Sequence, residues 1–123
     1  MTARMPHGWH AVTPRLVVKD PEDLAAFLSR VFEASVESRQ GAPLVVTIGD
    51  SKLMVSGVGD REAHRTFLYV YVADADAAYE RALEEGARPI EKPFDTPYGD
   101  RRCMIEDRWG NTWQIAVHAG NVA

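Results

Sequence analysis

The chain of 123 residues contains a single cysteine, Cys103, and therefore no internal disulfide. Nothing in its cysteine usage argues for an oxidising compartment. Basic residues are also scarce, since 14 Lys and Arg stand against 18 Asp and Glu and give a net charge of -4. A protein whose main partner is nucleic acid needs clustered basic residues. This charge balance therefore argues against nucleic acid as a partner.

Long apolar runs are absent as well. No stretch approaches the roughly 20 apolar residues that a membrane-spanning helix needs. The first ten residues lack the apolar segment of a signal peptide. We therefore expect a cytoplasmic protein with no membrane partner. The 46% of hydrophobic and 26% of charged residues are typical of a globular chain, and the length is that of one domain.

Two segments have the periodicity of amphipathic helices. The first follows Asp20 and Pro21, which suit the helix cap and the first helical position. Its apolar residues recur at helical spacing and are Leu24, Phe27, Leu28, Val31 and Phe32. The second begins after Asp74 and ends at Gly86, where glycine suits a left-handed cap. Its charged side is expected to face solvent.

Eight short segments rich in Val, Ile, Tyr and Trp, separated by turn residues, are predicted strands. They are residues 12–18, 36–39, 44–48, 52–56, 66–72, 89–91, 101–106 and 112–118. The order is strand, helix and three strands, followed by the same order again. A shift of 54 positions supports this repeat, because it carries Asp20 onto Asp74 and His10 onto His64. We predict an α+β fold of two βαβββ modules, with curved mixed sheets around a cavity and the helices outside.

The sequence also resembles a known family in five segments. They are GWHAVTPRLVVKD at 8–20, IGDSKLM at 48–54, YVYVADADAAY at 69–79, YGDRR at 98–102 and EDRWGNTW at 106–113. These segments resemble the PhnB-like branch of the vicinal oxygen chelate superfamily, which includes glyoxalases, bleomycin-resistance proteins and extradiol dioxygenases. The resemblance implies one domain over residues 1–123, with modules at about 10–60 and 64–118. It also implies a homodimer.

Catalytic members of that superfamily hold a divalent metal with His, Gln or Glu side chains from four strands. The resemblance places these positions at Thr13, Met54, Phe67 and Gln114. Gln114 alone offers a good oxygen ligand, whereas Phe67 cannot coordinate a cation and Met54 offers a soft thioether. We therefore predict no metal and no cofactor.

The histidines offer a further, weaker route to a metal or a base. His10 and His64 lie three residues before Thr13 and Phe67, so strand alternation places them on the opposite face. We favour capping or surface roles for both over a shared metal site. His118 shares a strand face with Gln114, and we favour a frayed C-terminal histidine over a base at the cavity mouth.

Two further segments raise open alternatives. Glu106 and Asp107 precede a turn, and we expect them to stabilise it rather than bind a ligand. The loop 91–100 either carries Phe94 and Tyr98 as a lid or is a proline-stiffened connection in which Asp100 pairs with an adjacent arginine, Arg101 or Arg102. Cys103 is expected to be a small buried thiol.

Strand alternation gathers aromatic and polar side chains on one face of the predicted sheets. Aromatic rings can stack on a planar ligand, and Arg15 can make a forked contact to an anionic group. The alternative is that these side chains merely fill the concave face. Trp113 and Ile115 should face the helix. The predicted ligand-binding residues are Thr13, Arg15, Met54, Phe67, Tyr69, Tyr71, Tyr98 and Gln114.

The leading hypothesis is a metal-independent small-molecule-binding protein that resembles the bleomycin-resistance type and takes a planar or amphipathic ligand. The alternative is a glyoxalase-like lyase or isomerase, or a dioxygenase-related enzyme, with an atypical or metal-free site. Such a site would use Tyr69, Gln114, Arg15 or His118. A weaker third possibility is a partner module whose cavity has collapsed. Catalysis is left open by the sequence.

Overall fold

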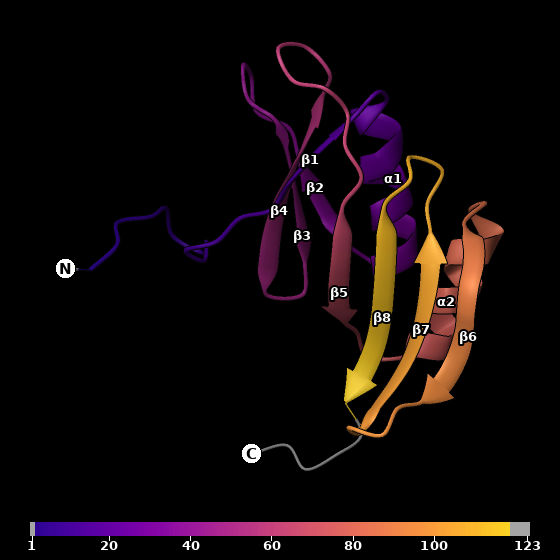
Figure 1. Cartoon of the computed structure of the whole chain (residues 1–123). Helices are drawn as coiled ribbons and strands as arrows, with labels where there is room; N and C mark the ends of the chain where they lie inside the picture. The colour runs from indigo at the N-terminus through magenta and orange to yellow at the C-terminus, as the bar shows by residue number, and fades with distance from the viewer. Residues whose placement is uncertain (1, 119–123) are drawn as a thin grey trace. The chain divides into compact units, whose positions relative to one another are not determined.

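The computed structural model describes residues 2–118, which form two compact units. The first unit comprises the residues up to 29 together with 33–64, and the second comprises 30–32 and the residues from 65 onward. Each unit contains one four-stranded sheet (Figure 1). Within the described residues, no helix is long and apolar enough to cross a membrane.

The sheet of the first unit follows the predicted element order. Strand β1 (Arg15–Val18) leads into helix α1 (Pro21–Phe32), and β2 (Ser35–Glu37), β3 (Leu44–Ile48) and β4 (Ser51–Gly57) follow. The strands are arranged in the order β1-β4-β3-β2, with β1 parallel to β4 and the other pairs antiparallel. Leu16, Val46 and Val55 are completely buried in this sheet.

The sheet of the second unit repeats this plan. Strand β5 (Phe67–Tyr71) precedes helix α2 (Ala75–Glu84), and β6 (Arg88–Asp95), β7 (Asp100–Glu106) and β8 (Thr112–His118) follow. The order is β5-β8-β7-β6, with β5 parallel to β8. Helix α2 covers one face of this sheet (Figure 1). The core residues Cys103, Ile105, Trp113 and Ile115 are completely buried, as predicted for Trp113 and Ile115.

The predicted α+β fold of two βαβββ modules is confirmed, since both sheets have the same strand order with corresponding parallel pairs. The cavity that the two modules would enclose stays a prediction. The second helix ends as expected, because Gly86 follows it with a φ of 92° and Asp74 accepts a hydrogen bond from the amide of Ala77.

The first helix differs at its cap. Asp20 occupies the N-cap position, but its side chain makes no capping hydrogen bond. Its backbone, at φ -121° and ψ 75°, departs from the more extended conformation of Asp74, at φ -147° and ψ 101°. The repeat therefore preserves the residue type at the two caps but not the hydrogen bond.

Two strand boundaries were also predicted wrongly. Strand β1 begins at Arg15, so Thr13 precedes the strand instead of lying within it. Strand β6 continues to Asp95, so Phe94 belongs to a strand and not to a loop. Pro93 and Pro97 indicate a loop in the sequence, but β6 is an edge strand, where Pro93, a residue without an N–H, is tolerated. The register of β6 against β7 is correspondingly irregular around Glu91.

Candidate functional site

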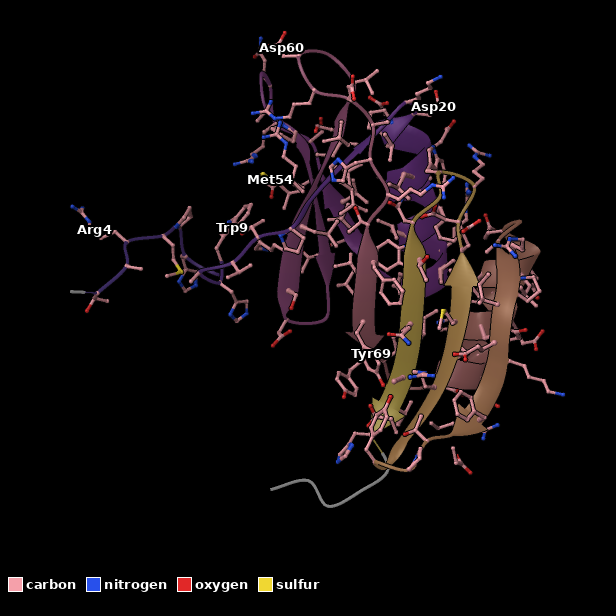
Figure 2. All side chains as sticks on the ribbon, viewed as in Figure 1. Arg4, Trp9, Asp20, Met54, Asp60 and Tyr69 are labelled. Carbon is pink, nitrogen blue, oxygen red and sulfur yellow. The ribbon has the colours of Figure 1, made fainter. Side chains whose placement is uncertain are left out.

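One face of the second sheet carries exposed aromatic side chains. Phe67 and Tyr69 of β5 pair with Thr112 and Gln114 of β8, and paired residues in neighbouring strands share a face. Phe67 is 62% exposed, and Tyr69, in the middle of β5, is 37% exposed (Figure 2). Tyr71, two residues further on, is 59% exposed. We call this side of the sheet, with Phe67, Tyr69, Tyr71 and Gln114, the aromatic face.

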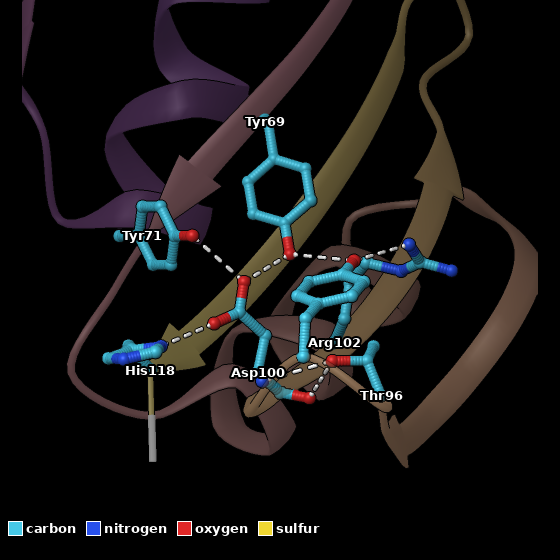
Figure 3. A network of polar contacts seen from close by, with 7 residues as sticks. Tyr69, Tyr71, Thr96, Asp100, Arg102 and His118 are labelled. Carbon is cyan, nitrogen blue, oxygen red and sulfur yellow. Dashed lines mark hydrogen bonds and ion pairs between the residues drawn. The ribbon is translucent and has the colours of Figure 1, made fainter. Parts of the chain in front are cut away.

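The carboxylate of Asp100 lies at one end of this face. The first residue of β7, Asp100, pairs with the last residue of β8, His118. Its side chain is only 1% exposed. The hydroxyls of Tyr69 and Tyr71 donate to Oδ2 at 2.6 and 2.8 Å, and Nδ1 of His118 lies 2.7 Å from Oδ1 (Figure 3). Three polar side chains from two strands therefore meet one buried acid.

The backbone on either side of Asp100 is fixed by Thr96. The Thr96 hydroxyl donates to the carbonyl oxygen of Asp100 at 2.8 Å and lies 3.0 Å from the Asp100 amide, which donates to it. The Thr96 amide also donates to that carbonyl, at 2.7 Å. Gly99 supplies the left-handed residue of this turn, with a φ of 93°. The turn thus holds the acid where both tyrosines reach it.

Hydrogen bonding and burial together determine the protonation of this cluster. The bonds from Tyr69 and His118 lower the pKa of Asp100. Burial and the neighbouring carboxylate raise the pKa of Tyr69, and the bond to Asp100 together with burial raises the pKa of Tyr71. At neutral pH the acid is therefore ionised and both phenols are neutral. An ionised carboxylate only accepts hydrogen bonds, so Nδ1 of His118 carries a proton.

A second group of contacts extends the site toward β6. Arg102 donates to the hydroxyl of Tyr98 at 2.9 Å and to Oε1 of Glu91 at 3.0 Å. Its guanidinium lies 5.1 Å from the centre of the Phe94 ring. The Tyr98 hydroxyl lies 3.4 Å from that of Tyr69. Tyr98 is 56% exposed, yet these contacts hold its hydroxyl in place.

The alternative in which Asp100 pairs with Arg101 or Arg102 is wrong, since Asp100 bonds to Tyr69, Tyr71 and His118. Arg101 instead contacts Asp76 of α2 at 2.8 Å and Asp95 at 3.2 Å. Strand alternation explains the difference for Arg101, which points to the helix-covered side while Asp100 points to the opposite side. Arg102 lies on the same side as Asp100 but pairs with Glu91 at 3.0 Å. The expectation of a frayed His118 is also wrong, because this residue ends β8 and bonds to Asp100.

Three predicted ligand-binding residues lie in the first unit. Arg15 and Met54 are register partners on β1 and β4, and Thr13 is half-buried just before β1. Nε of Arg15 donates to the hydroxyl of Ser56 at 3.2 Å. Arg15 also lines an open pocket of about 470 Å³ whose other walls are the start of α1, the segment 38–44 and the end of β4. That these three residues share one site with the second unit's aromatic face stays a prediction.

The residues at the expected metal positions do not fit a divalent cation. The exposed ring of Phe67 has no atom that could coordinate a metal. Its neighbours on the aromatic face are Thr112 and Tyr69. Asp100, the acid of this face, already accepts three hydrogen bonds. Between residues 2 and 118, no group of three or more His, Cys, Asp or Glu side chains is placed to hold a metal.

The central residue of the cluster, Asp100, was missed as a site residue by sequence reasoning. The pairing of β7 with β8 could have identified it. A tight turn between Glu106 and Thr112 makes these two residues partners, and stepping back along both strands brings Asp100 opposite His118. Asp100 then falls on the face of Gln114 and the tyrosines.

Comparison with known proteins identifies the class. Residues 9–115 match the model of the Glyoxalase/Bleomycin resistance protein/Dioxygenase superfamily, and the chain belongs to this superfamily. The PhnB-like branch stays a prediction. A curated relative, "Uncharacterized protein Mb0911c" of Mycobacterium bovis, is 26% identical, with 85% of this chain and 81% of that protein covered.

Solved structures share the fold. TioX from Micromonospora sp. ML1 superposes with a TM-score of 0.76 at 24% identity, over 89% of this chain and 98% of that one. A glyoxalase/bleomycin resistance protein/dioxygenase family enzyme from Burkholderia phytofirmans PsJN gives a TM-score of 0.70 at 18% identity, over 85% and 94%. At these identities the comparison establishes the architecture, and the function must be argued from the site.

Proposed function

We propose that this protein binds a planar or amphipathic small molecule on the aromatic face of its second sheet without a metal, as a protein of the bleomycin-resistance type. The observation that carries the proposal is a set of exposed aromatic rings, two of which are tyrosines whose hydroxyls are held by a buried acid. Phe67 and Tyr71 expose more than half of their surface, while the Tyr71 hydroxyl is tied to Asp100.

Fixed rings favour stacking because little conformational freedom is lost on binding. Tyr69 and Tyr71 lie 5.3 Å apart between ring centres, at 53° to each other. Both hydroxyls bond to the same carboxylate, so neither side chain can swing away from Asp100 without breaking a charge-assisted hydrogen bond. A flat ligand thus meets a surface that is already in place.

Polar groups beside the rings can orient such a ligand. Gln114 lies beside Tyr69 in register, and its amide offers both a donor and an acceptor. A ligand surface of aromatic walls with a few placed polar groups is the usual form of a small-molecule site. The face is therefore suited to a flat ring system that carries hydrogen-bonding substituents.

Metal analysis and a ligand titration test the proposal together. Protein purified without chelators should contain no stoichiometric Ni, Zn, Fe or Mn. It should bind 4-nitroanisole, a flat probe without an ionisable group, with amide shift changes confined to the second sheet in NMR spectra. Phe67→Ala should weaken this binding about threefold to tenfold, the range for one aromatic contact.

Val58→Ala is the matched control, because Val58 is an exposed apolar residue (47%) of the first unit. It should leave the affinity for 4-nitroanisole unchanged. Stoichiometric metal, or equal effects of the two substitutions, would contradict the proposal.

We also propose a cytoplasmic homodimer. Sedimentation at micromolar concentration tests the assembly, and a 13.7 kDa monomer would contradict it. If Phe67→Ala dissolves the dimer, the aromatic face is an interface between copies and not a ligand surface.

A further inference from the structure

His118 has one nitrogen committed to Asp100 and one that is not. Within residues 2–118, Nδ1 is the ring nitrogen with a hydrogen-bond partner, at 2.7 Å. Because Asp100 is ionised and accepts this bond, Nδ1 holds the proton of the neutral ring and Nε2 holds a lone pair. The His118 side chain is 41% exposed, so this lone pair belongs to a side chain that solvent reaches.

The acid fixes the tautomer and the orientation of this histidine. A carboxylate that accepts a hydrogen bond from one imidazole nitrogen holds the ring in place and leaves the other nitrogen as the acceptor, as in the acid–histidine pairs of hydrolases. The charged groups around the pair are the acid itself and Arg102 on β7, which is engaged by Glu91 and Tyr98. The phenols of Tyr69 and Tyr71 face it from β5 and remain neutral.

The position of the pair indicates what donates the proton. Tyr71 and His118 bond to the two oxygens of one carboxylate, so the exposed Tyr71 ring and the His118 ring lie next to each other at the end of the aromatic face (Figure 3). An aromatic ligand with a phenol-type hydroxyl carries its most acidic hydrogen in the plane of its ring. Such a hydroxyl is complementary to Nε2 of His118, which lies beside the aromatic face.

We infer that the Asp100–His118 pair is a proton-accepting subsite for the acidic hydroxyl of a planar aromatic ligand. In this step the ligand O–H bond breaks, its electron pair stays on oxygen, and the proton forms a bond to Nε2 of His118. The product is a phenolate beside an imidazolium, whose charge is balanced by Asp100. The inference rests on the proposed function and specifies its ligand class. His118 contacts the ligand, and Asp100 positions the His118 ring.

The probe is 4-nitrophenol, whose anion absorbs visible light and so reports its own ionisation. The protein should bind it as the anion and should lower its apparent pKa. It should also bind 4-nitrophenol about tenfold more tightly than 4-nitroanisole, the effect of one charge-assisted hydrogen bond. His118→Gln should abolish this preference, whereas His10→Gln should keep it, because His10 is an exposed histidine of the first unit.

A measurement on the unsubstituted protein avoids any effect of substitution on folding. Long-range ¹H–¹⁵N correlation spectra should show His118 with its proton on Nδ1 and a bare Nε2 when the ring is neutral. Asp100→Asn should shift the proton toward Nε2, since an amide can donate to Nδ1 where a carboxylate cannot. A proton on Nε2 in the unsubstituted protein would overturn the inference.

The outcomes separate the two proposals. Binding of 4-nitroanisole and 4-nitrophenol with equal affinity, or binding of 4-nitrophenol in its neutral form, overturns the proton-accepting subsite and leaves the ligand surface standing. Failure of both probes to bind overturns the ligand surface, and the subsite with it.

Discussion

The indole Nε1 of Trp113 donates a hydrogen bond to Oδ2 of Asp107 at 2.9 Å, with both side chains buried. Asp107 also accepts from the amides of Trp109 and Asn111, each at 2.9 Å, and from the Asn111 side chain at 3.0 Å. The predicted turn-stabilising role of Asp107 is thus confirmed. This turn makes Glu106 the partner of Thr112 and so brings Asp100 opposite His118.

Asp107→Ala should therefore destabilise the protein by about 3 kcal/mol, because four donors lose their acceptor in a buried turn. Urea unfolding followed by circular dichroism measures the loss. Glu106→Ala is the neighbouring control. Glu106 makes a partly exposed ion pair with Arg88 at 3.3 Å, worth less than about 1 kcal/mol. Equal losses for the two substitutions would contradict the assignment.

Stability at acid pH should depend on Asp100. Its folded-state pKa is lowered, mainly by the Tyr69 bond, so the carboxylate contributes stability above the ordinary aspartate pKa of about 4. That contribution is lost as the pH falls through the lowered value. Urea midpoints measured from pH 6 down to pH 2 should fall more steeply for the native sequence than for Asp100→Asn. Parallel curves would show that Asp100 is not coupled to folding.

Alkaline titration should distinguish the tyrosines that bind Asp100. The pKa values of Tyr69 and Tyr71 are raised, so their contribution to stability is complete below the ordinary tyrosine pKa of about 10 and is lost as the pH rises through the folded-state values. Absorbance at 295 nm should show two late-ionising phenols. Tyr69→Phe and Tyr71→Phe should each remove one. Early ionisation of both would refute the hydrogen-bonded cluster.

Cys103 should be inert in the folded protein. The thiol is fully buried in β7, and burial is the main cause that raises its pKa to about 12. A chromogenic disulfide reagent at pH 8 should therefore react slowly with native protein and stoichiometrically after unfolding in urea. Fast reaction of the native protein would place the thiol at the surface.

The two helix caps should respond differently to the same substitution. Asp74→Ala removes a side-chain bond to the Ala77 amide and should cost about 1 kcal/mol of unfolding free energy. Asp20→Ala removes no such bond and should lower the unfolding free energy by only about 0.3 kcal/mol, because it removes a negative charge near the N-terminal end of the helix dipole. Thermal unfolding of the two variants makes the comparison; a larger loss at Asp20 would contradict the difference between the caps.

Local patterns in the sequence predicted most of the fold. Apolar spacing and capping residues located both helices, and β8 was predicted with its observed ends. The errors fell where tertiary context overrides local preference. Pro93 and Pro97 indicated a loop from residue 91, yet β6 is an edge strand that accommodates Pro93 and continues to Asp95.

The site was predicted in part, for a similar reason. Alternation within β5 and β8 placed Phe67 and the tyrosines on the face of Gln114. The role of Asp100 depends on a pairing between strands, because its partners are 18 to 31 residues away in sequence. Periodicity within one segment carries no information about such pairings.

The prolines of β6 have a consequence for solubility. Pro89 and Pro93 interrupt the row of amide donors on the outermost strand of the second sheet, and its register is broken at Glu91. A strand from another molecule could therefore form neither a continuous row of backbone hydrogen bonds with β6 nor a regular register against it. This border of the sheet is thereby protected against edge-to-edge pairing with other chains and growth into fibrils, and Pro93 contributes to this protection although in the sequence it indicated a loop.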